Sequence, residues 1–156
     1  MDPAELDPLR GMKVTLMLAD AAQVAEGKLH VLGAGWTFTG PQPTPFAVTG
    51  IIEVPWHLAN QQHSFRFDLI DQQGNPVHVE TPEGEQPLFF EGHFEVGRMP
   101  GLQAGTGIPF PFAINSGPIP LDPGGHYEWR LLINGEAHED WRLAFSTRPE
   151  AQSNVA

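Results

Sequence analysis

Residues 121–135 read LDPGGHYEWRLLING and contain the clearest structural pattern in the chain. Proline and glycine at positions 123–125 predict a turn, because proline fixes φ and glycine tolerates positive φ. From Tyr127 onward apolar and polar residues alternate, which predicts a strand with one buried face. The dipeptide Asn134-Gly135 then predicts a tight β-hairpin. The stretch as a whole indicates a turn, a half-buried strand and a return strand.

Turn-forming residues between short apolar runs recur along most of the 156 residues. Glycine (17) and proline (16) exceed a fifth of the chain and lie between short apolar runs, as in proteins built of many short strands. Residues 64–70 alternate cleanly between apolar and polar side chains. Pro109 and Pro111 share one parity within residues 108–114. Because proline donates no hydrogen bond, this predicts an edge strand or a strand whose N–H groups there face away from a neighbour. With no convincing helical period, these strand candidates predict an all-β fold.

Four residues of the opening stretch, Leu121, Pro123, Gly124 and Tyr127, resemble the corner of fibronectin type III domains. In that corner a tyrosine opens a strand, and its hydroxyl group bonds to backbone a few residues upstream. The resemblance extends through the final predicted strand. It implies an immunoglobulin-like two-sheet β-sandwich of about eight to nine mostly antiparallel strands.

Residues 18–33 are similar to the opening of a group of small bacterial β-sandwich proteins that have no assigned activity. This similarity implies a family but no function. We expect one domain at residues 12–147 between flexible tails at 1–11 and 148–156, because both ends are polar and lack periodicity. Met12 offers a second start position.

Composition excludes several classes of function. The net charge is −11 and basic residues are few and dispersed, so neither nucleic acid nor an anionic membrane is expected as a partner. The chain has no cysteine, which excludes disulfides, thiolate metal sites and cysteine nucleophiles. No apolar run approaches the ~20 residues of a membrane span, and the acidic N-terminus lacks a signal-peptide core. We expect a cytoplasmic protein without a cofactor.

One set of residues has the chemistry of a metal site. Glu91, His93 and Glu95 lie at a spacing of two, so a strand would place all three on one face. Carboxylate and imidazole groups together suit a borderline divalent ion. Same-face neighbours are ~7 Å apart, so all three would reach one ion only if Gly92 bent the strand. The alternative is the solvated face of an amphipathic strand, which the same pattern predicts.

Two of the four tryptophans, Trp36 and Trp56, lie near glycine or proline and are candidates for a rim position. Exposed aromatic rings can stack on sugars or anchor a partner protein. Packing that closes an open end of the fold is the structural alternative.

No set of residues for nucleophilic or phosphate chemistry is present, because no serine lies in a Gly-x-Ser-x-Gly motif and no phosphate-binding loop occurs. We therefore expect a non-catalytic β-sandwich module for protein–protein contact, assembly or self-association. The strand with Pro109 and Pro111 and the loop at residues 98–107 are the parts expected to meet a partner. A metal-binding protein or small metalloenzyme using Glu91, His93 and Glu95 is one alternative. Carbohydrate binding through Trp36 or Trp56 is another.

Overall fold

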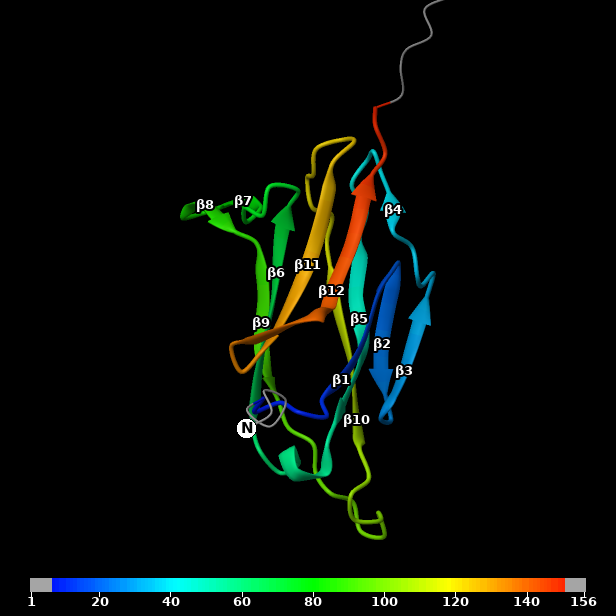
Figure 1. Cartoon of the computed structure of the whole chain (residues 1–156). Helices are drawn as coiled ribbons and strands as arrows, with labels where there is room; N and C mark the ends of the chain where they lie inside the picture. The colour runs from blue at the N-terminus through cyan, green and yellow to red at the C-terminus, as the bar shows by residue number, and fades with distance from the viewer. Residues whose placement is uncertain (1–6, 151–156) are drawn as a thin grey trace, which may run out of the picture.

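The computed structural model describes residues 7–150. Within that range the chain forms twelve strands and one short 3-10 turn, η2 (Trp56–Leu58) (Figure 1). The all-β prediction is therefore confirmed. The strand count is higher than predicted because two short hairpins and the two-residue strand β4 (Phe38–Thr39) add to the long strands.

Two larger sheets contain most of the strands. One has three antiparallel strands in the order β1 (Lys13–Ala19), β5 (Phe46–Val54) and β10 (Ile108–Ser116). The other has five, in the order β4, β12 (Glu136–Thr147), β11 (His126–Ile133), β6 (His63–Asp71) and β9 (Phe89–Phe94). Strand β4 pairs with β12 in parallel, and the remaining pairs of this sheet are antiparallel.

The core lies between these two sheets. Aromatic rings meet across it, and the ring centroids of Phe67 on β6 and Phe112 on β10 are 5.7 Å apart. The alternation of apolar and polar residues on β11 buries one face of the strand, as predicted. Trp129, Leu131 and Ile133 on that face are at most 1% exposed. Burial of such large side chains contributes about 1.5–3 kcal/mol each, so the seam between the sheets is the main source of stability.

Two hairpins form separate two-stranded sheets, β2 (Ala21–Ala25) with β3 (Lys28–Leu32), and β7 (His78–Thr81) with β8 (Gly84–Pro87). The β2–β3 hairpin covers part of the outer face of the three-stranded sheet. Ala22 packs there against Ala19 and Ala47, and its backbone N–H and C=O both bond to the side-chain amide of Asn115. The small side chains allow this close approach. The strands therefore do not divide into two sheets as the immunoglobulin-like prediction requires.

The packed region begins before the predicted boundary at residue 12. Leu9 is 3% exposed and belongs to the core, although it falls in the predicted N-terminal tail. Arg148, in the predicted C-terminal tail, donates its backbone N–H to the carbonyl oxygen of Thr39 at 2.7 Å. The rest of both tails, residues 1–6 and 151–156, lies outside the described residues.

Two local predictions are confirmed. Strand β10 is an edge strand of its sheet, as Pro109 and Pro111 require. Asn134 and Gly135 both have positive φ, at 52° and 79°, and form the two-residue turn between β11 and β12. Beyond the turn, the pairing of β11 with β12 shifts register between Arg130 and Leu132, so the polar residues 138–140 form a bulge.

The corner before β11 contains the tyrosine bond that the resemblance implies. The backbone N–H of Asp122 donates to the hydroxyl oxygen of Tyr127 at 3.0 Å. Thr147, at the end of β12, donates its hydroxyl to the Asp122 carbonyl at 2.6 Å and accepts the N–H of Gly125 at 2.8 Å. The corner is thus tied both to its own strand and to the neighbouring one. Burial raises the pKa of the Tyr127 phenol above its ordinary value, an effect that outweighs the lowering by the bond from Asp122.

Candidate binding pocket beside the Tyr127 corner

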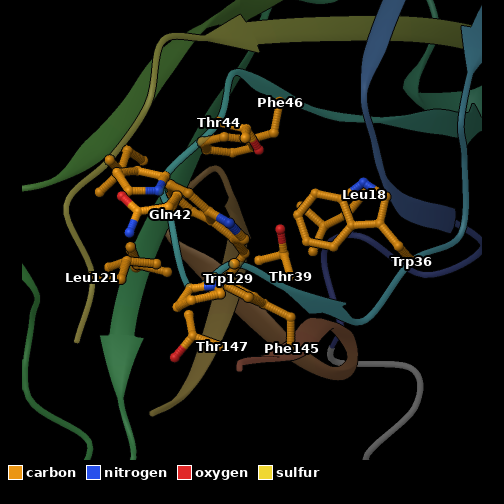
Figure 2. Close-up of a pocket in the computed structure, with 15 residues that line it drawn as sticks. Leu18, Trp36, Thr39, Gln42, Thr44, Phe46, Leu121, Trp129, Phe145 and Thr147 are labelled. Atoms are coloured by element: carbon orange, nitrogen blue, oxygen red, sulfur yellow. The ribbon is translucent and has the colours of Figure 1, made fainter. Parts of the chain in front are cut away.

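A pocket opens at the end of the sheets where β5 begins and β12 ends (Figure 2). Its walls come from six parts of the chain: β1, the segment from Trp36 to Phe46, β6, the segment before the corner, and the paired strands β11 and β12. None of the lining residues is charged. They are Leu18, Trp36, Thr39, Gly40, Pro41, Gln42, Pro43, Thr44, Phe46, Leu69, Ile119, Leu121, Trp129, Phe145 and Thr147.

The corner positions one wall of this pocket. Leu121 directly precedes the corner, and Thr147 links the corner to β12, so the residues that hold the turn also face the cavity. The Trp36 and Phe145 rings meet edge to face, with centroids 6.2 Å apart. Figure 2 shows the side chains of Trp36, Thr39 and Trp129 around this pocket.

The enclosed space is small. The cavity volume is about 40 Å³, whereas pockets for metabolite-sized ligands usually have ~300–1,000 Å³. A water molecule has a share of ~30 Å³ in the liquid. In this state the cavity has room for about one small group, such as the end of an aliphatic side chain.

Two residues that line this pocket carry a buried polar atom without a hydrogen-bond partner. The indole Nε1 atoms of Trp36 and Trp129 are both buried, and neither has an acceptor within bonding distance. They are the two side-chain atoms in residues 7–150 that are buried and unsatisfied in this way. Buried donors are normally paired, because an unpaired one loses its bond to water without replacement. Both tryptophans line this pocket and carry an indole N–H without a partner.

The two tryptophans predicted at the rim lie at opposite ends of the molecule. Trp36 lines the pocket near Phe46, whereas Trp56 follows Val54 at the other end of β5. A strand of this length spans about 27 Å, so the two rings cannot form one platform. The guanidinium of Arg98 covers the Trp56 ring at 4.5 Å and donates to the Trp56 carbonyl.

The structure places Glu91 and His93 on β9 and Glu95 just after it, all exposed. Glu91 pairs with Arg66, whose Nη1 lies 3.8 Å from its carboxylate. Within residues 7–150, no group of three or more histidine, aspartate or glutamate side chains is arranged to hold a metal ion. The common face predicted from the spacing of two is thus seen, while metal binding stays a prediction.

The pocket itself could not be predicted from the sequence. Trp36 is a predicted rim residue and Leu121 a predicted corner residue, but no pattern in the sequence connects them. A signal exists in residues 41–45, Pro-Gln-Pro-Thr-Pro, whose alternating prolines indicate an extended segment that cannot join a sheet.

Within the described part of the chain, no helix combines the length and apolar composition needed to cross a membrane.

A family model matches residues 14–146, which is most of the chain, and the family is described as one of unknown function. The prediction that the chain is similar to a family without an assigned activity is confirmed. The matching family is not the fibronectin type III family that the corner resembles. No curated protein matches the chain.

Proposed function

The chain belongs to DUF6941, a family of unknown function, and we propose that it is a non-catalytic all-β module that holds a partner protein at the pocket end of its sheets. The observation that carries this proposal is the uncharged pocket with two unpaired indole donors. Its small volume suits one side chain of a partner better than a metabolite. An immunoglobulin-like relationship of the two larger sheets is part of the same proposal, supported by the bond between Asp122 and Tyr127.

The rim of the pocket supports a protein partner. Phe38, next to the lining residue Thr39, is 48% exposed. The guanidinium of Arg148, next to the lining residue Thr147, lies 4.8 Å from the centre of the Phe38 ring. Aromatic and arginine side chains are enriched in protein interfaces and in their energetic hot spots. An apolar pocket with such a pair at its rim has the layout of an anchoring site.

The proposal is tested by affinity capture from an extract of the protein's own host, with three forms of the protein as bait. These are the unmodified protein, Phe38→Ser at the pocket end and Met99→Ser at the other end. Met99 is the matched control because it is an exposed apolar residue, at 68%, and lies in the loop that the sequence favoured for partner contact. Quantitative mass spectrometry compares the captured proteins, including a differently tagged second copy.

We expect one captured protein to be lost with Phe38→Ser and retained with Met99→Ser. A second copy of the chain that shows this behaviour identifies the contact as self-association. Loss with Met99→Ser alone moves the interface to residues 98–107 and contradicts the proposed site. Capture that neither substitution changes contradicts it as well.

A further inference from the structure

Strand β9 is an open edge of the five-stranded sheet. It pairs with β6 on one side, and Figure 1 shows it as the outermost of the long strands there. Within residues 7–150, the backbone of β9 makes no backbone–backbone hydrogen bond outside its pairing with β6. Such an edge presents unpaired N–H and C=O groups with which another strand can pair.

The register on β6 shows which backbone groups of β9 face this edge. Leu69 donates its N–H to the Leu88 carbonyl at 3.3 Å, and the antiparallel register continues unbroken from there along β9. Because bonded and non-bonded pairs alternate in such a ladder, every second residue of β9 turns its backbone away from β6. Ser64 on β6 agrees, since its carbonyl accepts the Asn134 N–H at 2.9 Å on the β11 side. The residues of β9 with outward-facing backbone groups are Phe89, Glu91 and His93.

The other edges of the two larger sheets are less suited to pairing. Strand β4 has only two residues, and β10 carries Pro109 and Pro111. On β1 the Leu18 carbonyl already accepts the N–H of Gly35 at 2.7 Å. Strand β9 has six residues and no proline, so its edge is the one best able to accept a further strand.

We propose that β9 pairs with β9 of a second copy of this chain, antiparallel and centred on Gly92. In this register Glu91 of each copy lies opposite His93 of the other, and Phe90 lies opposite Phe94. A two-fold interface repeats each contact, so two pairs of carboxylate and imidazole form. The imidazole can donate a hydrogen bond to the carboxylate in its neutral form and adds a charge when protonated.

The side chains on the outer face select this register. Outward-facing residues must lie opposite each other to exchange hydrogen bonds, so the register can shift only between a few positions. A pair centred on Glu91 sets two carboxylates opposite each other, and a pair centred on His93 sets Glu91 opposite Glu95. Like charges at opposite positions destabilise a strand pair, whereas opposite charges stabilise it. Of these three registers, the one centred on Gly92 has complementary side chains.

The groups in question are accessible. Glu91 and His93 are both exposed. Glu91 has one charged neighbour at 3.8 Å, Nη1 of Arg66, and that arginine also binds Asp68 at 2.7 Å through its Nε. A contact at 3.8 Å leaves the carboxylate oxygens of Glu91 free to accept a hydrogen bond from an imidazole. The contact is separate from the pocket, because no pocket-lining residue belongs to β9.

The first test is sedimentation velocity of the full-length, untagged protein from low micromolar to near-millimolar concentration. EDTA is present, so that a metal ion bridging Glu91 and His93 does not contribute. We expect a reversible equilibrium between monomer and dimer. His93→Glu sets two carboxylates opposite each other at both symmetric positions and should weaken the dimer about 2- to 30-fold.

The exchanged double variant, Glu91→His with His93→Glu, should restore the dimer. It has the same composition as the unmodified protein and again sets a carboxylate opposite an imidazole. Glu85→His is the matched control, because it removes an exposed carboxylate from β8, outside the proposed contact. It should leave the equilibrium unchanged. Thermal unfolding of each variant verifies that the fold is retained.

Single-cysteine variants report the register, because the chain itself has no cysteine. Opposite residues of a bonded antiparallel pair have Cα atoms about 5.5 Å apart, which lies within the range for a disulfide. Under mild oxidation a mixture of Glu91→Cys and His93→Cys should therefore form a mixed disulfide-linked dimer. Each variant alone should cross-link at least several-fold more slowly.

A protein that stays monomeric at every concentration would overturn the inference. So would a dimer that His93→Glu leaves unchanged, or Glu91→Cys that cross-links with itself faster than with His93→Cys. Phe38→Ser distinguishes this failure from failure of the proposed function. If Phe38→Ser abolishes the dimer while His93→Glu does not, self-association occurs at the pocket end and the pairing of β9 is wrong.

Discussion

The substitution Tyr127→Phe tests the corner that forms one wall of the pocket. It removes the hydroxyl oxygen that accepts the Asp122 N–H at 3.0 Å and leaves the rest of the side chain in place. The ring still stacks on Phe145, whose centroid lies 5.7 Å away. The change therefore isolates one hydrogen bond from the packing around it.

We expect the free energy of unfolding to fall by about 1–2 kcal/mol. A neutral hydrogen bond contributes about 0.5–1.5 kcal/mol net, and a buried donor left without a partner adds to the loss. Asp122 is exposed, so water can reach its N–H and the loss stays below that of a fully buried donor. In a chain of 156 residues, each kcal/mol corresponds to a fall in Tm of roughly 2–4 °C.

Urea denaturation followed by tryptophan fluorescence measures this loss, with unchanged m-values as the check on two-state behaviour. Thr147→Val is the companion variant, because Thr147 makes two hydrogen bonds in the same corner. We expect it to lose more stability than Tyr127→Phe. Both residues bond to the peptide groups of Asp122, so the double variant should show a coupling of at least about 0.5 kcal/mol. A loss below about 0.3 kcal/mol for Tyr127→Phe would refute the claim that this bond stabilises the corner.

The remaining predictions concern pH, the hairpin turn, a glycine and the metal hypothesis. Burial raises the pKa of Tyr127, so the folded state binds the phenolic proton more tightly than the unfolded chain does. The resulting stabilisation is complete below about pH 10 and is lost as the pH rises through the folded-state pKa. Since the chain has one tyrosine, tyrosinate absorbance reports this group alone, and a midpoint at or below that of the urea-unfolded protein would contradict the assignment. Asn134→Ala should cost about 2–3 kcal/mol in chemical denaturation, because it loses a side-chain bond to the Ser64 N–H in a positive-φ turn; Asn134→Gly should cost less, and equal losses would show that the turn conformation contributes nothing. Gly50→Ala should prevent folding or lower Tm severely, because its Cβ would overlap the Thr15 carbonyl oxygen. Gly117→Ala, with open space around the residue and no positive φ, serves as the mild comparison. Metal analysis of untagged protein incubated with Zn²⁺ tests the hypothesis for Glu91, His93 and Glu95: stoichiometric metal that is lost with His93→Ala supports it, and metal-free protein contradicts it.

The fold class could be predicted from the sequence because several segments alternate apolar and polar residues with a period of two. Strand β11 is the clearest case, and the turn after it follows from the positive φ that Asn134 and Gly135 tolerate. The number and arrangement of sheets could not be predicted. The β2–β3 hairpin covers the sheet through Ala19, Ala22 and Ala47, and alanine has no strong preference that would reveal such a contact in the pattern.

Only single residues of the candidate site could be predicted from the sequence. Trp36 and Leu121 are far apart in sequence, and they meet because β4, β12 and the corner bring their segments together. Pairing of strands distant in the chain depends on long-range contacts that local pattern does not encode. The exposed face of Glu91 and His93 was predictable, because it needs only the alternation along one strand.

The prolines on β10 have a consequence for the behaviour of the protein at high concentration. Every second residue of this strand turns its backbone toward the open edge, and two of these positions, Pro109 and Pro111, have no N–H to offer. An unfolded chain or another sheet edge that paired with β10 would lack two consecutive hydrogen bonds, because Pro109 and Pro111 have no N–H to donate. The edge is thereby protected against the strand-by-strand growth that leads to aggregation. Growth by strand pairing is therefore disfavoured at β10, whereas β1, the other edge of the same sheet, contains no proline.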